Sequence, residues 1–191
     1  MTRTFIGVRI APEPGNALEQ WIQHVQPYID AKRWYNKEHF HITIHFLGNQ
    51  TDEQLREIDN ICAAVVQEFS PFTLSLHSIG MFERAKVVWA GVQGELSVLQ
   101  HLYQKLWPIL KVADCEKGAR PRLTPHITLG RLKKVPTKQE FQEISEQIAQ
   151  LDQRLSPSYR WRVTQIDRFE SVSTPNGVQY PIRAAFDLSM A

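Results

Sequence analysis

A chain of 191 residues, 42% of them hydrophobic, can bury a sizeable core, and this composition argues against a disordered protein. The net charge of +2 excludes a strongly cationic polymer binder but leaves room for a local basic patch. Two cysteines are too few for a disulfide scaffold and favour a reducing compartment. No run approaches the roughly 18 apolar residues of a membrane span. We therefore expect a cytoplasmic protein with no membrane partner.

The spacing of apolar residues predicts alternating strands and helices in the first half of the chain. In order, they are a strand at 4–10, a helix at 14–26, a strand at 40–47, a helix from Thr51, and strands near 72–79 and 86–92. Thr51 and Gln54 form a capping-box pattern, which marks the start of the second helix.

The second half predicts a similar succession. It comprises a helix from residue 96 towards 110, a strand near 125–132, a helix after Thr137, and strands near 159–169 and 178–187. Pro108 is expected to kink or end the first of these helices. Thr137 and Glu140 repeat the capping-box pattern.

The tripeptide His-Ile-Thr occurs once in each half, beginning at His41 and at His126. Each copy lies on a predicted strand between two predicted helices. This repetition indicates an internal duplication, with two similar α+β lobes facing each other across a cleft. Because no linker or low-complexity segment separates them, we expect a single domain over residues 1–191, made of two interleaved lobes.

Side chains alternate between the two faces of a strand, which divides the first motif into a polar and an apolar face. His39, His41, Thr43 and His45 should share one face, pointing at solvent or a cleft. In the second motif, His126 and Thr128 share a face. If a pseudo-twofold axis relates the lobes, His41 and His126 meet across the cleft, each with its threonine beside it.

Two opposed imidazoles suit phosphoryl transfer, since histidine titrates near 6.5 and one ring can be neutral while the other is protonated. The neutral ring can take a proton from the attacking group, and the protonated ring can give one to the leaving oxygen. Thr43 and Thr128 could hydrogen-bond the phosphate oxygens, and Arg131 could stabilise transition-state charge. None of these steps requires a metal.

A single strand histidine is usually an ordinary surface or core residue, but two H-x-T copies at matching points are stronger evidence of function. His39 and His45 have Thr124 and Gly130 at the matching positions, so we expect them to be structural or peripheral. A metal site on the shared face is the alternative. No acidic residue lies within the motif and the spacing matches no zinc pattern, so we expect no metal and no other cofactor.

The stretches HITIHFLG and PHITLGR resemble the two signatures of the 2H phosphoesterases. The chain is most similar to the bacterial and archaeal RNA 2',3'-cyclic phosphodiesterases, also called 2'-5' RNA ligase-like proteins. FIGVRI, VVWAGV and IDRFESVSTPNGVQYPI extend the likeness over essentially the whole chain. The resemblance implies a bilobal α+β fold, with antiparallel sheets and outer helices around a central groove. It also implies metal-independent opening of a 2',3'-cyclic phosphate to a 2'-phosphate, and in some members formation of a 2'-5' linkage.

Carried over to this sequence, the resemblance places His41 and Thr43 in the first motif and His126, Thr128 and Arg131 in the second. It implies that His41 is the proton donor and His126 the proton acceptor, although a pseudo-symmetric site leaves the reverse direction open. The expected partner is RNA with a 2',3'-cyclic phosphate end or a related nucleotide. Since no stretch signals an oligomer interface, we expect a monomer.

Arg131 and Phe46 each lie five residues beyond their motif histidine, so strict alternation sends them to the opposite face. A bulge or the strand end could turn them into the groove, or they could act from its rim. Phe46 is then either a core residue or a stacking surface for a base. Trp34 and Tyr35 could add aromatic rings to the rim, although Trp34 could equally well fill a place in the core. Several bases could add positive charge to the rim, namely Arg84, Lys86, Arg120, Arg122, Lys133 and Lys134.

Two other functions stay open. One is a phosphodiesterase acting on small cyclic nucleotides or 2'-5' oligonucleotides. The other is a non-catalytic RNA-binding module, which the pair of titratable imidazoles argues against because binding alone does not need them.

Overall fold

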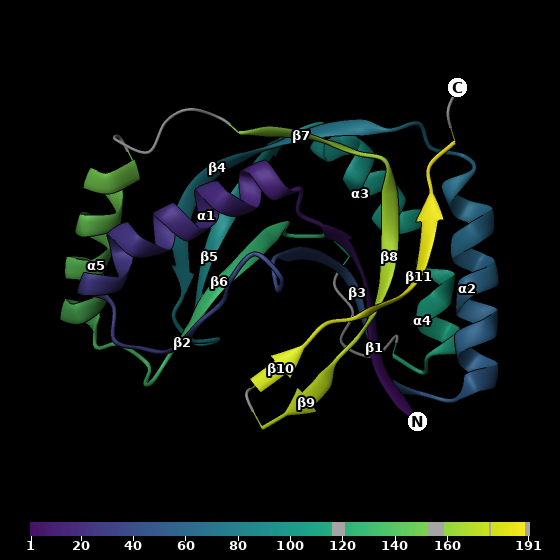
Figure 1. Cartoon of the computed structure of the whole chain (residues 1–191), viewed down its shortest axis with the longest axis horizontal. Coiled ribbons are helices and arrows are strands. Elements are labelled where there is room, and N and C mark those ends of the chain that lie inside the picture. Colours follow the sequence, from purple (N-terminus) through teal and green to yellow (C-terminus); the bar gives the residue numbers. More distant parts are fainter. Residues whose placement is uncertain (116–120, 153–158, 176, 190–191) are drawn as a thin grey trace.

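A continuous antiparallel sheet carries both motifs in the computed structural model, which describes residues 1–115, 121–152, 159–175 and 177–189. Its strands are β1 (Thr2–Arg9), β2 (Ala31–Trp34), β3 (His41–Gln50), β4 (Phe72–Phe82), β5 (Val87–Gly94), β6 (His126–Leu132), β7 (Arg160–Val163), β8 (Gln165–Glu170) and β11 (Ile182–Asp187). Within the described residues the order is β11-β8-β1-β3-β6-β5-β4-β7, and β2 also pairs with β6. The sheet curls strongly (Figure 1). Its antiparallel strands, together with the helices described below, confirm the predicted α+β class.

The sheet divides into two similar lobes at the junction of β3 and β6. One lobe has the order β11-β8-β1-β3, and the other has β7-β4-β5-β6. The first lobe therefore takes its strands from both ends of the chain, and the second takes its strands from the middle. The lobes are interleaved and do not follow the two halves of the sequence, because β1 pairs with β8 rather than with β4 or β5.

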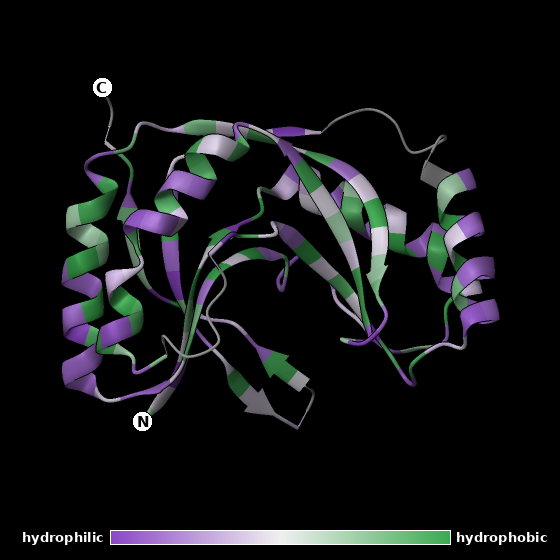
Figure 2. Cartoon of the chain, turned by 180° about the vertical axis from the view of Figure 1, so that it is seen from behind, coloured by the Kyte–Doolittle hydropathy of each residue, from purple (hydrophilic) through white to green (hydrophobic). Residues whose placement is uncertain are grey.

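Helices cover the outer side of each lobe (Figure 1). They are α1 (Pro12–Val25), α2 (Asp52–Val66), α3 (Leu96–Lys105), α4 (Pro108–Val112) and α5 (Lys138–Asp152), with a 3₁₀ turn η1 (Gln26–Tyr28). α2 contacts β8 and β11 and is joined by α3 and α4, whereas α5 contacts β4 and α1. Figure 2 shows hydrophilic residues along the outer sides of α2 and α5. No helix in the described part of the chain is long and apolar enough to cross a membrane.

Both predicted capping boxes are present. The Gln54 backbone N–H donates to Thr51 Oγ1 (3.2 Å), and the Thr51 N–H donates to Gln54 Oε1 (3.0 Å). Glu140 and Thr137 make the same reciprocal pair, at 3.2 and 2.7 Å. These bonds satisfy N–H groups that have no partner inside the helix, which explains why α2 and α5 begin where they do. Pro108 opens α4, so the predicted helix is interrupted at this proline.

The C-terminal strands differ from the prediction. The expected strand at 159–169 is broken at Thr164, because β7 pairs with β4 in one lobe and β8 pairs with β1 in the other. The expected strand at 178–187 begins only at Ile182. Before it, β9 (Val172–Thr174) and β10 (Gly177–Gln179) form a separate hairpin that extends from the sheet (Figure 1).

β2 was also absent from the prediction. This short strand pairs with β6 beside the point where β3 leaves β6. Trp34 packs its ring on Gly130, where an added Cβ would lie 2.6 Å from the ring. Trp34 is therefore packed against the core, as one of its two predicted alternatives requires.

Candidate active site

The two motif strands cross at their central residues. Ile42 of β3 pairs antiparallel with Ile127 of β6, and both side chains are fully buried. Antiparallel geometry then places Thr43 beside His126 and His41 beside Thr128 on the opposite face. The arrangement is that of a pseudo-twofold axis running between the two isoleucines.

A bulge interrupts the alternation of β3 after Thr43. In the register with β1, Gly7 faces Thr43 and Ile6 faces His45, which leaves Ile44 without a partner. Ile44 and His45 are both buried, and the next residue, Phe46, is 49% exposed. The prediction that His45 shares the face of His41 is therefore wrong, because the bulge turns it into the core.

β6 has an irregularity at the corresponding place. Trp89 of β5 faces Thr128 and Val88 faces Gly130, so the residue between them on β6 has no partner. Beyond this bulge Arg131 is exposed on the same face as His126. Both motifs thus show the same order of partly exposed, buried and exposed residues. We had considered a bulge, the end of the strand or a position on the rim for Arg131 and Phe46. The structure shows a bulge before each of these residues.

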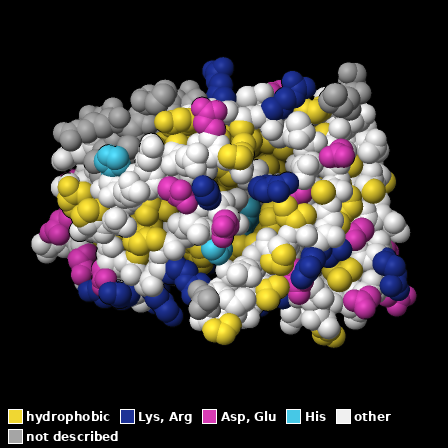
Figure 3. Space-filling model, viewed as in Figure 1, with side chains coloured by type: hydrophobic (Ala, Val, Ile, Leu, Met, Phe, Trp, Pro, Cys, Tyr) yellow, Lys and Arg dark blue, Asp and Glu magenta, His cyan; other side chains and the backbone are white. Residues whose placement is uncertain are grey.

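All six predicted site residues line a single groove of about 380 Å³. The groove is bordered by Arg3, Phe5, Tyr35, His39, His41, Thr43, Phe46, His126, Thr128, Arg131, Ser171 and Tyr180. In the space-filling view, histidine side chains are visible near the centre of the face, with Lys and Arg side chains around them (Figure 3). The expected convergence of His41 and His126 on one cleft therefore holds in the structure.

Each motif histidine is oriented by a backbone carbonyl two residues earlier. His41 Nδ1 donates to the carbonyl of His39 (2.7 Å), and His126 Nδ1 donates to that of Thr124 (2.9 Å). A carbonyl only accepts, so Nδ1 carries the hydrogen in both rings. Nε2 is therefore the nitrogen of each ring that remains for proton transfer.

The two histidines differ in their surroundings. Aromatic rings enclose His41, with centroids at 4.6 Å for Phe5, 5.1 Å for Tyr180 and 5.5 Å for Phe169. This burial lowers the pKa of His41 to about 4; the bond to His39 opposes the shift, and the nearby His126 adds to it. His126 contacts one ring edge-on, Phe82 at 5.1 Å.

The other two histidines of the first motif differ in position, since His45 is buried in the core and His39 borders the groove. His45 Nε2 donates to the Tyr103 carbonyl (2.8 Å), and burial lowers its pKa to about 4. His39 lies at the groove, but its ring nitrogens bond the Asn36 side chain and the Val178 carbonyl (2.9 Å). Because His45 points into the core, the three histidines do not converge as metal ligands, and the part of the chain that the structure describes has no other such cluster.

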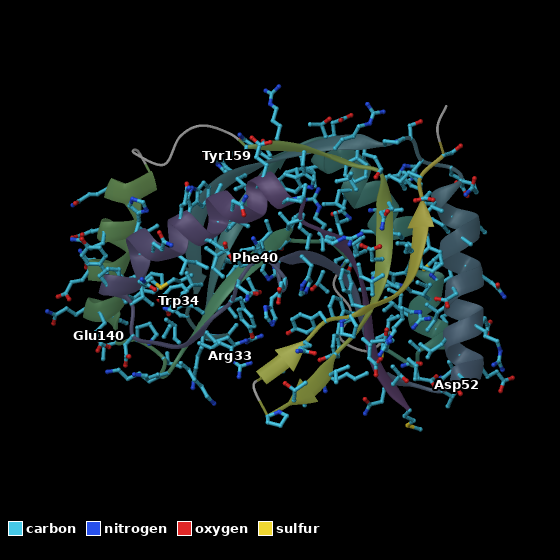
Figure 4. The ribbon with its side chains drawn as sticks, viewed as in Figure 1. Arg33, Trp34, Phe40, Asp52, Glu140 and Tyr159 are labelled. Carbon is cyan, nitrogen blue, oxygen red and sulfur yellow. The ribbon has the colours of Figure 1, made fainter. Side chains whose placement is uncertain are left out.

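The β9–β10 hairpin contacts the segment that runs from β2 to β3, and the residues on either side of the hairpin, Ser171 and Tyr180, line the groove. His39 reaches it through the Val178 carbonyl. Arg33 of β2 lies against Gly177, where an added Cβ would be 2.9 Å from Nη1 (Figure 4). Tyr180 follows the hairpin, and burial raises the pKa of its phenol, with Tyr35 beside it adding to the shift.

Phe46 and Arg131 lie at corresponding places in the two lobes. Arg131 Nη1 donates to the Ala85 carbonyl (3.4 Å). Arg3 Cζ lies 4.9 Å from the centre of the Phe46 ring, a cation–π contact that brings a guanidinium to the other side of the groove. Arg3 of one lobe and Arg131 of the other therefore both line the groove.

The predicted basic rim is only partly present. Arg84 lines an adjoining hollow together with His126 and Arg131. Lys133 is paired with Asp30 (2.6 Å) and Lys134 with Glu140 (2.8 Å). Lys86 and Arg122 line neither hollow, and Arg120 lies outside the described residues.

Sequence reasoning missed four groove residues, namely Arg3, Phe5, Ser171 and Tyr180. Phe5 did leave a signal, because it falls on the face opposite the apolar stripe of Ile6 and Val8. A large aromatic on the polar face of a strand indicates a binding surface. Tyr180 left none, because its place depends on a hairpin that the sequence did not predict.

The two H-x-T motifs thus bring His41, Thr43, His126 and Thr128 together in one groove. Residues 14–173 match the model of the 2'-5' RNA ligase superfamily. The match spans most of the chain, so the protein belongs to this family of 2H phosphoesterases. The resemblance read from the two motifs is confirmed, and with it the prediction of an enzyme.

Individual relatives agree with this assignment. The chain is 26% identical to the RNA 2',3'-cyclic phosphodiesterase of Thermotoga maritima, over 94% of this chain and 92% of that protein. It is also 26% identical to the Methanocaldococcus jannaschii protein of the same name, over 94% and 97%. Among solved structures, E. coli LigT complexed with 3'-AMP has the same fold, with a TM-score of 0.78, 22% identity and 99% coverage of both chains.

Proposed function

We propose that this protein hydrolyses the 2',3'-cyclic phosphate at an RNA end to a 2'-phosphate, with His41 as proton donor and His126 as proton acceptor and without a metal. The observation that carries the proposal is the shared groove, into which two crossed strands bring two imidazoles with the same Nδ1 bond. The names of the curated relatives support the same substrate. We further propose that it acts in the cytoplasm as a monomer, since one chain supplies every residue named in the reaction.

In this reaction the cyclic phosphate lies between the two Nε2 atoms. His126 Nε2 takes a proton from water as the water oxygen bonds to phosphorus. The bond from phosphorus to O3' breaks, and His41 Nε2 gives its proton to O3'. One water is consumed, the product has a 2'-phosphate and a 3'-hydroxyl, and proton exchange with solvent returns both rings to their starting states.

The remaining groove residues bind and stabilise charge. Thr43 and Thr128 flank the histidines and can donate hydroxyl hydrogen bonds to the non-bridging oxygens. Arg131 adds a fixed positive charge where negative charge accumulates in the transition state. Phe46, with its exposed ring, offers a stacking surface for the terminal base.

The proposed direction of proton transfer requires His41 to be protonated when the substrate is bound. A lowered pKa keeps His41 neutral at pH 7 in the unliganded protein, whereas a proton donor must be protonated. A phosphate bound in the groove brings a negative charge next to the ring, which raises the pKa of His41. The reverse assignment, with His41 as acceptor, needs no such rise.

Product analysis tests the proposal. An oligonucleotide with a 2',3'-cyclic phosphate end is incubated with the protein, with and without a strong chelator, and the product is identified as 2'- or 3'-phosphate. We expect 2'-phosphate in both conditions. A 3'-phosphate product contradicts the proton assignment, and loss of turnover with chelator contradicts metal independence.

Alanine variants test the residues. His41→Ala and His126→Ala should each lower kcat by about 10²–10⁴-fold, because each removes one proton-transfer step. His24→Ala is the matched control, since His24 lies exposed on α1 away from the groove. Near-normal turnover by either motif variant contradicts the acid–base pair.

Two related activities are separated by the same assay. A groove of about 380 Å³ can hold a single nucleotide, so a nucleoside 2',3'-cyclic phosphate is tested beside the oligonucleotide. Equal turnover of both assigns the enzyme to small nucleotides. Formation of a 2'-5' linkage, which the family's name raises, is tested by adding an RNA with a 5'-hydroxyl.

A further inference from the structure

The two motif histidines occupy corresponding places in the lobes, but their surroundings are built differently. β8 and β4 have the same position in the strand orders of the two lobes. The ring of Phe169, near the end of β8, lies 5.5 Å from that of His41, and the ring of Phe82, at the end of β4, lies 5.1 Å from that of His126. After β4 the short connection 83–86 leads directly into β5, whereas β8 is followed by the β9–β10 hairpin and then by Tyr180.

Tyr180 closes the groove on the side of His41. The centre of its ring lies 5.1 Å from that of His41, with the rings at 75°, and 5.4 Å from that of Phe5. On the other side, His126 borders both the groove and the adjoining hollow of about 800 Å³. The hairpin and Tyr180 therefore make two pseudo-symmetric histidines unequal.

The side chain of His39 connects this hairpin to the β2–β3 segment. Its Nε2 donates a hydrogen bond to the Val178 carbonyl (2.9 Å), since a carbonyl only accepts. Its Nδ1 meets the side-chain amide of Asn36, which holds the ring from the other side. Val178 lies two residues before Tyr180. The bond from His39 thus fixes the end of the hairpin from which Tyr180 continues.

The backbone of His39 holds His41 as well. The His39 carbonyl accepts the bond from His41 Nδ1 (2.7 Å), so this residue contacts both the catalytic imidazole and the hairpin that covers it. At the matching position of the second motif, the Thr124 carbonyl accepts from His126 Nδ1 (2.9 Å), but Thr124 itself lines the open hollow. A histidine at position 39 and not at position 124 agrees with a hairpin on one side only.

The enclosure controls how His41 responds to a bound phosphate. Burial lowers the pKa of the unliganded ring to about 4. The titratable or charged groups near it are His39, His126 across the groove, the Tyr180 phenol, and Arg9 opposite it in the β1 register. Charges attract more strongly where water is excluded, so a phosphate should raise the pKa of an enclosed imidazole more than that of a hydrated one.

We propose that His39 is a positioning residue: by holding the β9–β10 hairpin it keeps Tyr180 against His41, so that His41 becomes protonated when a phosphate is bound. His39 acts through Tyr180 and not on the reacting atoms. The inference rests on the proposed function, in which His41 is the proton donor.

The test follows the His41 ring by NMR titration of the full chain, with its resonances assigned by their loss in His41→Ala. The pKa is measured with and without inorganic phosphate in the wild type, His39→Ala and His39→Gln. Both variants remove the charge of His39, but glutamine can still donate an amide N–H to the Val178 carbonyl. Glu38→Ala, an exposed change in the same loop, is the matched control.

In His39→Ala, the unliganded pKa of His41 should rise from about 4 towards the ordinary 6.5, and phosphate should raise it by less than in the wild type. His39→Gln and Glu38→Ala should stay close to the wild type. At the pH optimum of each protein, His39→Ala should lower kcat on the cyclic-ended oligonucleotide by about tenfold with a smaller change in KM, because the donor is less well aligned.

A double variant tests whether His39 acts through Tyr180. Tyr180→Ala alone should raise the pKa of His41, and adding His39→Ala to it should raise that pKa little further, because the ring that His39 keeps in place is already absent. Additive shifts show that His39 acts on His41 by another route, which contradicts the proposal.

The proposal is also overturned if His41 in His39→Ala keeps its wild-type pKa, if His39→Gln behaves like His39→Ala, or if the pKa shifts while kcat stays normal. The pKa measurement needs no turnover, so it is independent of the proposed activity. A wild type that does not open a 2',3'-cyclic phosphate contradicts the proposed function, whereas an unshifted His41 in an active His39→Ala contradicts the role of His39.

Discussion

Ile42 and Ile127 lie directly opposite each other at the point where the two motif strands cross. This pair fixes the site, because the residues on either side of it point together into the groove. Each histidine then lies beside the threonine of the other motif, so each half of the site is built from both lobes. β3 and β6 separate beyond the crossing, and that separation opens the groove.

The crossing makes Thr43 and Thr128 a matched pair for mutation. Thr43→Val and Thr128→Val keep the side-chain volume but remove a hydroxyl donor to the phosphate. Each should lower kcat by about tenfold or more, which is the cost of one hydrogen bond to a charged group. Steady-state kinetics on the cyclic-ended oligonucleotide measures this effect.

Serine substitutions are the controls, because Thr43→Ser and Thr128→Ser retain the hydroxyl. They should stay within a few-fold of the wild type. If valine and serine variants are equally impaired, the methyl group and not the hydroxyl matters, and the assigned role is wrong.

The pKa of His41 is a direct test of its surroundings. NMR titration of the unliganded protein should give a pKa near 4, because aromatic rings exclude water from the imidazole. Tyr180→Ala should raise the pKa by admitting water, and His126→Ala should raise it by removing a neighbouring positive charge. Bound phosphate should raise it further. An unliganded His41 pKa near 6.5 contradicts the enclosed environment.

The alternation of side chains between the two faces of a strand predicted most of the site correctly. It did so because the motif histidines and threonines precede the bulges in both strands. His41, Thr43, His126 and Thr128 share the groove as predicted. Beyond the bulges the same rule fails, as it does for His45. A bulge depends on the pairing of neighbouring strands, which a single sequence does not reveal.

The strand composition of each lobe could not be predicted from the sequence, again because it depends on which strands pair. Periodicity locates β8 approximately, but nothing local shows that its partner is β1, far away in the chain. The chain passes from one lobe to the other at Thr164. The sequence pattern therefore predicted one continuous strand through this residue. Local signals were reliable where the structure is local, as at the helix caps of Thr51 and Thr137.

His45 should make stability depend on pH. Its folded pKa of about 4 lies below the ordinary 6.5, so the unfolded chain binds the proton first as pH falls. Its contribution is complete above pH 6.5 and is lost as pH falls towards 4, by up to about 3 kcal/mol. Urea unfolding across this range measures the slope.

His45→Phe separates this contribution from others. Phenylalanine retains the stacking on Tyr103, whose ring lies 4.3 Å from that of His45, but cannot be protonated. The free energy of unfolding should fall less steeply with acid in this variant, although His41 still contributes in the same direction. An unaltered slope in His45→Phe means that His45 is not the titrating group.

Substrate binding should depend on the Phe46 ring and the guanidinium above it. Phe46→Ala removes a surface on which a base can stack, and this stacking contributes about 1–3 kcal/mol per base, so KM should rise by about tenfold or more with little change in kcat. Phe46→Tyr keeps the ring and should bind normally. Arg3→Gln should weaken binding more at low salt than at high salt, because its contribution is a charge exposed to screening. If Phe46→Ala instead lowers kcat at constant KM, the ring acts on the chemical step and not as a stacking surface.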